Sequence, residues 1–146
     1  MSYIDENLLP DEHVVYRAAL HWIIFARTIL VLVGGLVLVF VPGAAPAGLV
    51  VLLVGAVMLA PPFVAYRTTE LGVTNKRVIV KTGLVQRRTL ELLLRQVEAI
   101  SVDQSLLGRV FGFGSITLTG TGGVREVFHR VGDPLELRRR ILGQVA

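Results

Sequence analysis

Two long apolar runs separated by a short turn constrain this chain more than any other feature. Residues 22–41 carry a single charge, Arg27, and residues 47–66 carry none. Each run has 20 residues, and a helix of that length is about 30 Å long, which matches the hydrocarbon thickness of a bilayer. The turn between them, Pro42-Gly-Ala-Ala-Pro46, is also uncharged. The sequence therefore predicts a transmembrane helical hairpin over residues 22–66.

The cations around this hairpin predict its orientation. Arg17 and Arg27 lie near the start of the first run, and Arg67, Lys76 and Arg77 follow the second, whereas the turn has no charge. The positive-inside rule then places both termini in the cytoplasm and the turn outside. Arg27 is close enough to the helix end to extend to the head groups, and we interpret it in that way rather than as a buried functional charge.

Small residues and prolines predict the internal structure of the hairpin. Gly34-Gly35, Gly48 and Gly55 permit two helices to pack closely. Pro61-Pro62 predicts a kink or an end in the second helix.

Residues 1–21 read as a cytoplasmic or interfacial segment in front of the hairpin. Pro10-Asp11-Glu12 has the features of a helix start, with proline in the first turn and acids beside the N-terminus. We expect a helix from there, with an apolar stripe between Val14 and Ile23 that leads into the membrane.

Residues 67–146 predict a separate α+β domain. Short runs rich in β-branched residues alternate with Gly and Asn turns, which is typical of antiparallel strands. Asp133 as N-cap, Pro134 in the first turn and Glu136 at a capping-box position predict a C-terminal helix. Ser105–Phe111 is expected to be one helical turn or a packed loop. Five or more short strands are expected, at 77–82, 84–92, 97–103, 115–119 and 124–131, and residues 68–74 lead into the first of these through an Asn75-Lys76 turn.

Several spaced motifs in this region resemble a known family. Val73-Thr-Asn-Lys-Arg-Val-Ile-Val80 is similar to the signature of the second type of bacterial pleckstrin-homology-like (PH-like) membrane proteins. Arg95–Ser115, Ile116–Gly123 and Val131-Gly-Asp-Pro134 match that family in the same order. The resemblance implies a curved antiparallel sheet, or partly open barrel, capped by a C-terminal helix. It also implies a bacterial cytoplasmic (inner) membrane location and no catalytic residues.

The residue types and their spacing also indicate no catalytic, metal-binding or phosphate-binding site. The chain has no cysteine and three histidines, which lie far apart in sequence without metal-ligand spacing. The glycine-rich stretches 112–114 and 120–123 lack phosphate-loop spacing. We therefore expect no enzyme, no cofactor, no metal and no small-molecule substrate. Nucleic acid is not expected either, because the basic domain has no aromatic stacking platform.

Basic residues are the candidate contacts for a partner. Residues 67–146 have 13 Lys or Arg against 7 Asp or Glu, a net charge of +6. If the strands around them pair as a hairpin, several of these cations lie on one surface that suits anionic lipid or an acidic partner. The alternative is structural, with Arg77 tied to Asp103 or Glu98. The primary candidates are Lys76, Arg77, Lys81, Arg87 and Arg88. The secondary candidates are Arg138, Arg139 and Arg140, for which a solvated helix face is the alternative.

Two hypotheses follow for function. The first is a non-enzymatic, membrane-tethered interaction module that binds a protein partner, a second copy of itself or anionic lipid at the cytoplasmic face. The second is a structural homo-oligomer in which hairpins pack through Gly34-Gly35 and Gly55 into a ring, with the PH-like domains as a cytoplasmic collar.

Overall fold

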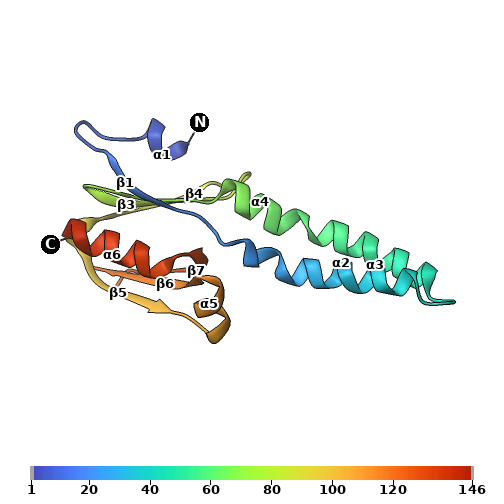
Figure 1. Ribbon diagram of the computed structural model, residues 1–146. Helices are drawn as coiled ribbons and strands as arrows, with labels where there is room; N and C mark the ends of the chain where they lie inside the picture. The colour runs from blue at the N-terminus through green and yellow to red at the C-terminus, as the bar shows by residue number, and fades with distance from the viewer. Residues whose placement is uncertain (1, 146) are drawn as a thin grey trace. The chain divides into compact units, whose positions relative to one another are not determined.

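The structure is a computed structural model that describes residues 2–145. The chain forms two compact units: the segment up to His21 together with the segment from Thr68 onward, and Trp22–Arg67 between them. We call the first the folded domain and the second the helical hairpin (Figure 1). Each is described on its own.

The helical hairpin is an antiparallel pair of apolar helices. The first arm joins a 3-10 turn, Trp22–Phe25, to α2, Ala26–Val39. The second arm joins α3, Ala45–Met58, to α4, Ala60–Thr68. The break between α3 and α4 lies just before Pro61-Pro62, so the expected interruption is confirmed.

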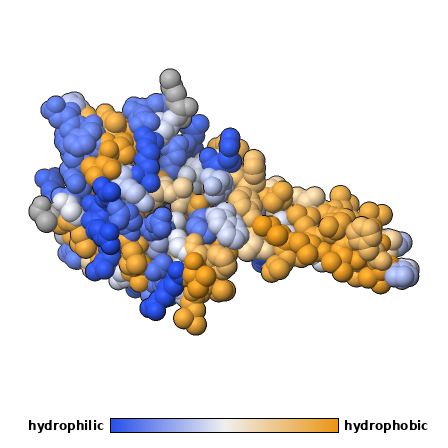
Figure 2. All heavy atoms as spheres, viewed as in Figure 1, coloured by the Kyte–Doolittle hydropathy of each residue, from blue (hydrophilic) through white to orange (hydrophobic). Residues whose placement is uncertain are grey.

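Both arms are long and apolar enough to cross a membrane. The candidate spans are Trp22–Val39, with 18 residues, and Ala45–Thr68, with 24. At 1.5 Å per residue they measure about 27 Å and 36 Å, against about 30 Å of hydrocarbon. Only 11% of an 18-residue apolar window in each span is buried within the structure, and Figure 2 shows the hairpin surface as almost continuously hydrophobic.

Glycines set the distance between α2 and α3. A Cβ at Gly48 would lie 2.6 Å from the Val39 nitrogen, and one at Gly55 would lie 2.7 Å from a Leu32 methyl carbon. The expected close packing is therefore present at Gly48 and Gly55. A Cβ at Gly34 would meet nothing within 4 Å, so this glycine has no packing role inside the hairpin.

Among the residues that the structure describes, the folded domain has seven antiparallel strands in two sheets. The first sheet has the order β1-β2-β3-β4 and the second β5-β6-β7. Backbone hydrogen bonds join the segment just after β1 to β7, where the His21 nitrogen donates to the Arg130 carbonyl and the Gly132 nitrogen to the Ala19 carbonyl. The strands are β1 Val14–Ala18, β2 Glu70–Thr74, β3 Arg77–Thr82, β4 Arg88–Leu93, β5 Val97–Asp103, β6 Phe113–Gly120 and β7 Arg125–Gly132.

Short helices complete the domain, and α6 closes its core. Leu137 and Ile141 of α6, Pro134–Val145, join a single apolar cluster whose other members come from both sheets and from Leu94 in the turn between them. The long C-terminal helix was expected, as was its start at Pro134. Glu136, expected to complete a capping box, instead pairs with Arg139 and Arg140. The remaining elements are α1 Tyr3–Glu6, a 3-10 turn Leu94–Gln96 and α5 Leu106–Phe111.

The expected helix after Pro10 is wrong. Residues Val14–Ala18 form strand β1, which pairs with β2 from Ala18 opposite Leu71 to Val14 opposite Thr74. A segment that precedes the hairpin in sequence is therefore part of the first sheet, and the two β-strands on either side of the hairpin lie side by side. Tertiary pairing has overridden the local helix signal of Pro10-Asp11-Glu12.

Candidate functional site

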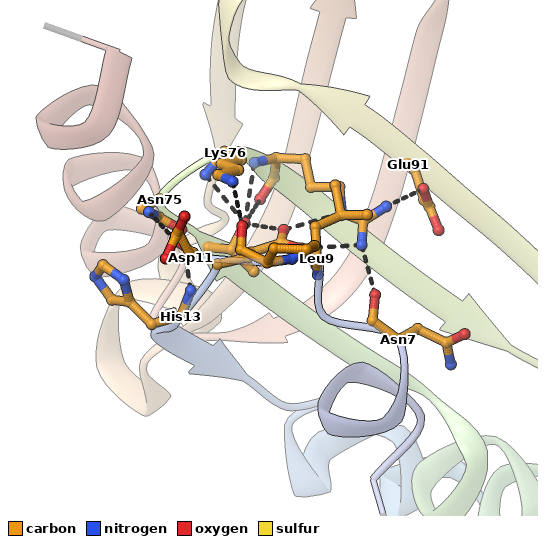
Figure 3. A network of polar contacts seen from close by, with 11 residues as sticks. Asn7, Leu9, Asp11, His13, Asn75, Lys76 and Glu91 are labelled. Carbon is orange, nitrogen blue, oxygen red and sulfur yellow. Dashed lines mark hydrogen bonds and ion pairs between the residues drawn. The ribbon is translucent and has the colours of Figure 1, made fainter.

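The Thr74-Asn75-Lys76-Arg77 turn holds the N-terminal segment (Figure 3). Asn75 accepts a hydrogen bond from the His13 nitrogen at 3.0 Å and donates to the Asp11 carbonyl at 3.1 Å. The Lys76 ammonium donates to the Pro10 carbonyl at 2.6 Å. The side chains of all four residues therefore bind the segment 7–13: Thr74 and Arg77 bind Glu12, and Asn75 and Lys76 bind backbone groups. We call this arrangement the N-terminal clamp.

Arg77 and Glu12 form the buried centre of the clamp. The Arg77 Nε lies 3.0 Å from Glu12, whose side chain is fully buried, while the Arg77 side chain is 8% exposed. The guanidinium also pairs with Glu91 and donates to the Asn7 carbonyl at 2.7 Å. The alternative partners expected for Arg77, Asp103 and Glu98, are wrong, but its structural role is clear from these contacts.

Opposing effects set the charge state of this pair. Burial acts to raise the pKa of Glu12, but hydrogen bonds from the Leu9 nitrogen, the Thr74 hydroxyl and Arg77 outweigh it and hold the pKa below its ordinary value. Burial likewise acts to lower the pKa of Arg77, whereas Glu12 and Glu91 raise it, with a net increase. Both groups are therefore charged at neutral pH.

A second carboxylate, Glu70, holds the first turn of the chain. The Ser2 hydroxyl donates to Glu70 at 2.6 Å, and the nitrogens of Tyr3 and Ile4 donate to it at 3.3 and 3.4 Å. Burial acts to raise the pKa of Glu70, but these donors and the charge of Lys81 lower it below its ordinary value. Ile4 is 1% exposed and packs over Gly72. The N-terminal segment thus covers the outer face of the first sheet.

The five primary candidate cations separate into two groups. Lys76 and Arg77 lie at the start of β3 and belong to the clamp. Lys81, Arg87 and Arg88 lie at the other end of the β3–β4 hairpin, about 17 Å away for a six-residue strand. Arg77 is buried, and the exposed Lys76 is bound to the Pro10 carbonyl, so the second group holds the cations that lie outside the clamp.

The three cations of the second group, Lys81, Arg87 and Arg88, differ in their contacts and exposure. The Lys81 ammonium lies 5.5 Å from the centre of the Tyr3 ring. Arg88 pairs with Glu126 at 3.3 Å and keeps a side-chain exposure of 77%. Arg87 is exposed in the turn. Between these cations, Leu84 and Val85 are 63% and 95% exposed, so the turn presents apolar and basic side chains together.

Strand register places this turn at the end of the domain where the hairpin is attached. Glu70 pairs with Lys81 and Ala18 with Leu71, so residues 83–87 extend past the start of β2. That is the end at which the chain passes from His21 to Trp22 and from Arg67 to Thr68. We call residues 81–88 the basic turn.

The secondary candidates on α6 are mostly solvated. Arg139 and Arg140 pair with Glu136 at 3.1 and 2.7 Å, and Arg139 is 79% exposed. Arg140 also lies 5.8 Å from the centre of the Tyr16 ring. Arg138 is exposed. These contacts tie two of the three arginines to their own helix and to β1.

A set of apolar side chains on α5 was missed at the sequence level. Leu106 is 82% exposed, Leu107 64% and Val110 77%, and Figure 2 shows hydrophobic residues gathered over this part of the folded domain. Their positions at i, i+1 and i+4 place them on one face of the helix. The sequence predicted one helical turn or a packed loop over Ser105–Phe111, and it did not indicate that these apolar side chains are exposed.

The remaining polar clusters show no catalytic arrangement. Ser115 and His129 are cross-strand neighbours, 3.1 Å apart between Oγ and Nδ1, on an exposed surface. No carboxylate bonds the other nitrogen of His129 among the described residues. Over residues 2–145, no three His, Asp or Glu side chains are grouped to hold a metal ion.

The architecture defines a class: a seven-stranded, two-sheet PH-like domain with a capping C-terminal helix, into which an apolar helical hairpin is inserted. A family model described as Bacterial PH domain matches residues 24–145. The chain therefore belongs to the bacterial PH domain family, whose PH-like domains are generally non-enzymatic interaction modules. Searches of curated proteins and of solved structures found no match.

Proposed function

We propose that the protein is a membrane-tethered interaction module whose basic turn contacts anionic lipid on the cytoplasmic face. The hairpin spans the bilayer twice, with both termini in the cytoplasm. The observation that carries the proposal is the location of the basic turn at the end of the domain where the hairpin is attached. Lipid head groups lie within reach of that end once the hairpin is inserted.

The chemistry of the turn suits a lipid surface. Three cations, Lys81, Arg87 and Arg88, each gain about 1 kcal/mol from an anionic leaflet when they are close to it. Leu84 and Val85 are exposed to water in the structure and lose that exposure at the interface. Because the hairpin already holds the domain at the membrane, contacts of this size suffice without high intrinsic affinity.

Lys76, Arg77 and the three α6 arginines have smaller parts in this proposal. The clamp occupies Lys76 and Arg77, and Glu136 occupies Arg139 and Arg140. A protein partner or a second copy remains an alternative ligand for the same basic turn.

The assembly hypothesis has less support from the hairpin. It assigned packing between copies to Gly34-Gly35 and Gly55, yet Gly35 and Gly55 already contact the other helix of the same hairpin. Gly34 alone is open. The particle mass in detergent tests this hypothesis, and a monomer contradicts it.

Hydrogen exchange of the full chain in nanodiscs tests the lipid contact. We expect slower exchange at residues 83–88 in anionic than in zwitterionic nanodiscs, with the difference lost at high salt because exposed charges are screened. The Arg87→Glu, Arg88→Glu variant should lose the difference. Arg95→Glu is the matched control, because this exposed arginine lies beyond the opposite end of β4. Equal exchange in both lipids for the wild type contradicts the proposal.

A further inference from the structure

The α5 helix, Leu106–Phe111, is capped at both ends and packed against the domain through Gly108, with its apolar face outward. The Ser105 hydroxyl accepts a hydrogen bond from the Gly108 nitrogen at its start, and Gly112 ends it in a left-handed conformation with φ of 76°. Gly108 faces the domain, since a Cβ there would lie 2.5 Å from the Phe113 carbonyl oxygen. The local structure therefore fixes which face of α5 is exposed.

The exposure of this apolar face to water is unfavourable in free energy. Leu106, Leu107 and Val110 are 64–82% exposed on a helix of six residues. Isolated apolar residues on a surface need no explanation, but a contiguous group on a capped helix indicates an interaction site. The question is what covers it.

The chain itself brings α5 to the end of the domain where the hairpin is attached. The ring of Phe113, the first residue of β6, lies 5.3 Å from the ring of His21. His21 directly precedes Trp22, where the first candidate span begins. Val110 is three residues from Phe113, so their Cα atoms are at most about 11 Å apart.

The position of α5 next to His21 indicates that the bilayer covers its apolar face. The head-group layer is about 5–8 Å thick on each side of the hydrocarbon, so an inserted Trp22 places that layer next to His21. We infer that α5 inserts Leu106, Leu107 and Val110 into the interfacial region of the bilayer that the hairpin spans. Arg109 on the same helix extends its charged end to the head groups.

This contact differs in kind from the contact of the basic turn. The groove beside α5 is lined by charges of both signs: Asp103, Asp133, Glu136, Arg109 and Arg139. Net attraction to anionic lipid is therefore weak there, and burial of apolar area holds α5 in place. The inference rests on the proposed insertion of the hairpin but not on the lipid charge. Together, hairpin, basic turn and α5 fix the orientation of the domain on the membrane.

Single-cysteine labels test this inference in the full chain, which has no native cysteine. A fluorescent label at Leu107→Cys in reconstituted vesicles should be quenched by lipids that carry a nitroxide near the head group. The quenching should persist at high salt and in zwitterionic lipid. In a Leu106→Asp, Val110→Asp background the quenching should be lost.

Two control labels separate the possible failures. Leu30→Cys, on the exposed face of α2, reports whether the hairpin is in the bilayer. Val124→Cys is an exposed apolar position beyond the far end of β6, about 23 Å of strand away from Phe113, and should not be quenched.

Quenching at Leu30 but not at Leu107 overturns the α5 inference and leaves the proposed function intact. Equal quenching at Leu107 and Val124 also overturns it, because the contact is then unspecific. No quenching at Leu30 overturns both proposals. If high salt alone abolishes the quenching at Leu107→Cys, the contact is electrostatic and not apolar, which also overturns the inference.

Discussion

Replacement of Glu12 by glutamine should detach the N-terminal segment from the first sheet. The Glu12 carboxylate accepts hydrogen bonds from the Leu9 nitrogen and the Thr74 hydroxyl, both at 2.7 Å, and from Arg77 at 3.0 and 3.1 Å. Glutamine keeps the shape but has one acceptor oxygen and no charge. One N–H group then faces another donor, and Arg77 loses its buried counter-ion.

The contacts set the size of the expected effect. Loss of one partner of a buried ion pair costs about 3–5 kcal/mol. Glu91, with 41% side-chain exposure, stays paired with Arg77, so we expect the lower end, about 3 kcal/mol. For a folded domain of about 100 residues this corresponds to a fall of roughly 12–24 °C in melting temperature.

Hydrogen exchange of the full chain in detergent measures this effect, with residues 7–13 as the first reporters. Asp5→Asn is the matched control, because the Arg17–Asp5 pair is about half exposed and should contribute less than about 1 kcal/mol. Glu12→Met with Arg77→Met should recover much of the loss, since no unpaired charge then remains buried. If Glu12→Gln and Asp5→Asn have equal effects, the account of the clamp is wrong.

Three further predictions concern acid, the hairpin insertion point and helix packing. Because the pKa values of Glu12 and Glu70 are lower in the folded than in the unfolded chain, their stabilisation is complete above about pH 4.3 and is lost as the pH falls through the folded-state values. The protection factors of amides in the N-terminal segment, taken relative to the intrinsic exchange rate at each pH, should therefore fall in acid, and protection factors that stay unchanged down to pH 3 contradict this. A chain with residues 22–67 replaced by a short Gly-Ser linker should fold without detergent, as judged by β-sheet circular dichroism, because both segments of the folded domain are kept; a chain that aggregates or stays unfolded refutes the insertion. Gly48→Leu should lower the melting temperature of the helices in micelles far more than Gly34→Leu, and equal effects refute the α2–α3 packing.

The sequence was sufficient for elements whose signals are local. Alternation in 115–119, the Asn75-Lys76 turn and Pro134 at a helix start each depend on neighbouring residues only, and each corresponds to an observed strand, turn or helix. Apolar length also predicted two helical arms, although their ends differ by about two residues: α2 ends at Val39 and the second arm runs from Ala45 to Thr68, against the expected 22–41 and 47–66.

The parts that required the structure depend on contacts between distant segments. Strand β1 contains the strand-favouring residues Val14, Val15 and Tyr16, but it is only five residues long, and its pairing depends on β2, more than 50 residues later, which offers an open edge. The partners of Arg77 could not be predicted for the same reason, since they depend on the N-terminal segment covering the outer face of the sheet. The exposure of α5 depends on the fixed position of Gly108 against Phe113, which no local pattern shows.

Labelling of two single cysteines from outside intact bacterial cells, after removal of any outer barrier, tests the central claim most directly. Ala44→Cys lies in the turn between α2 and α3, and Val124→Cys lies in the folded domain. If the hairpin holds the domain on the cytoplasmic face, an impermeant maleimide labels Ala44→Cys in intact cells and Val124→Cys only after lysis. Labelling of Val124→Cys in intact cells, with Ala44→Cys protected, would contradict the account.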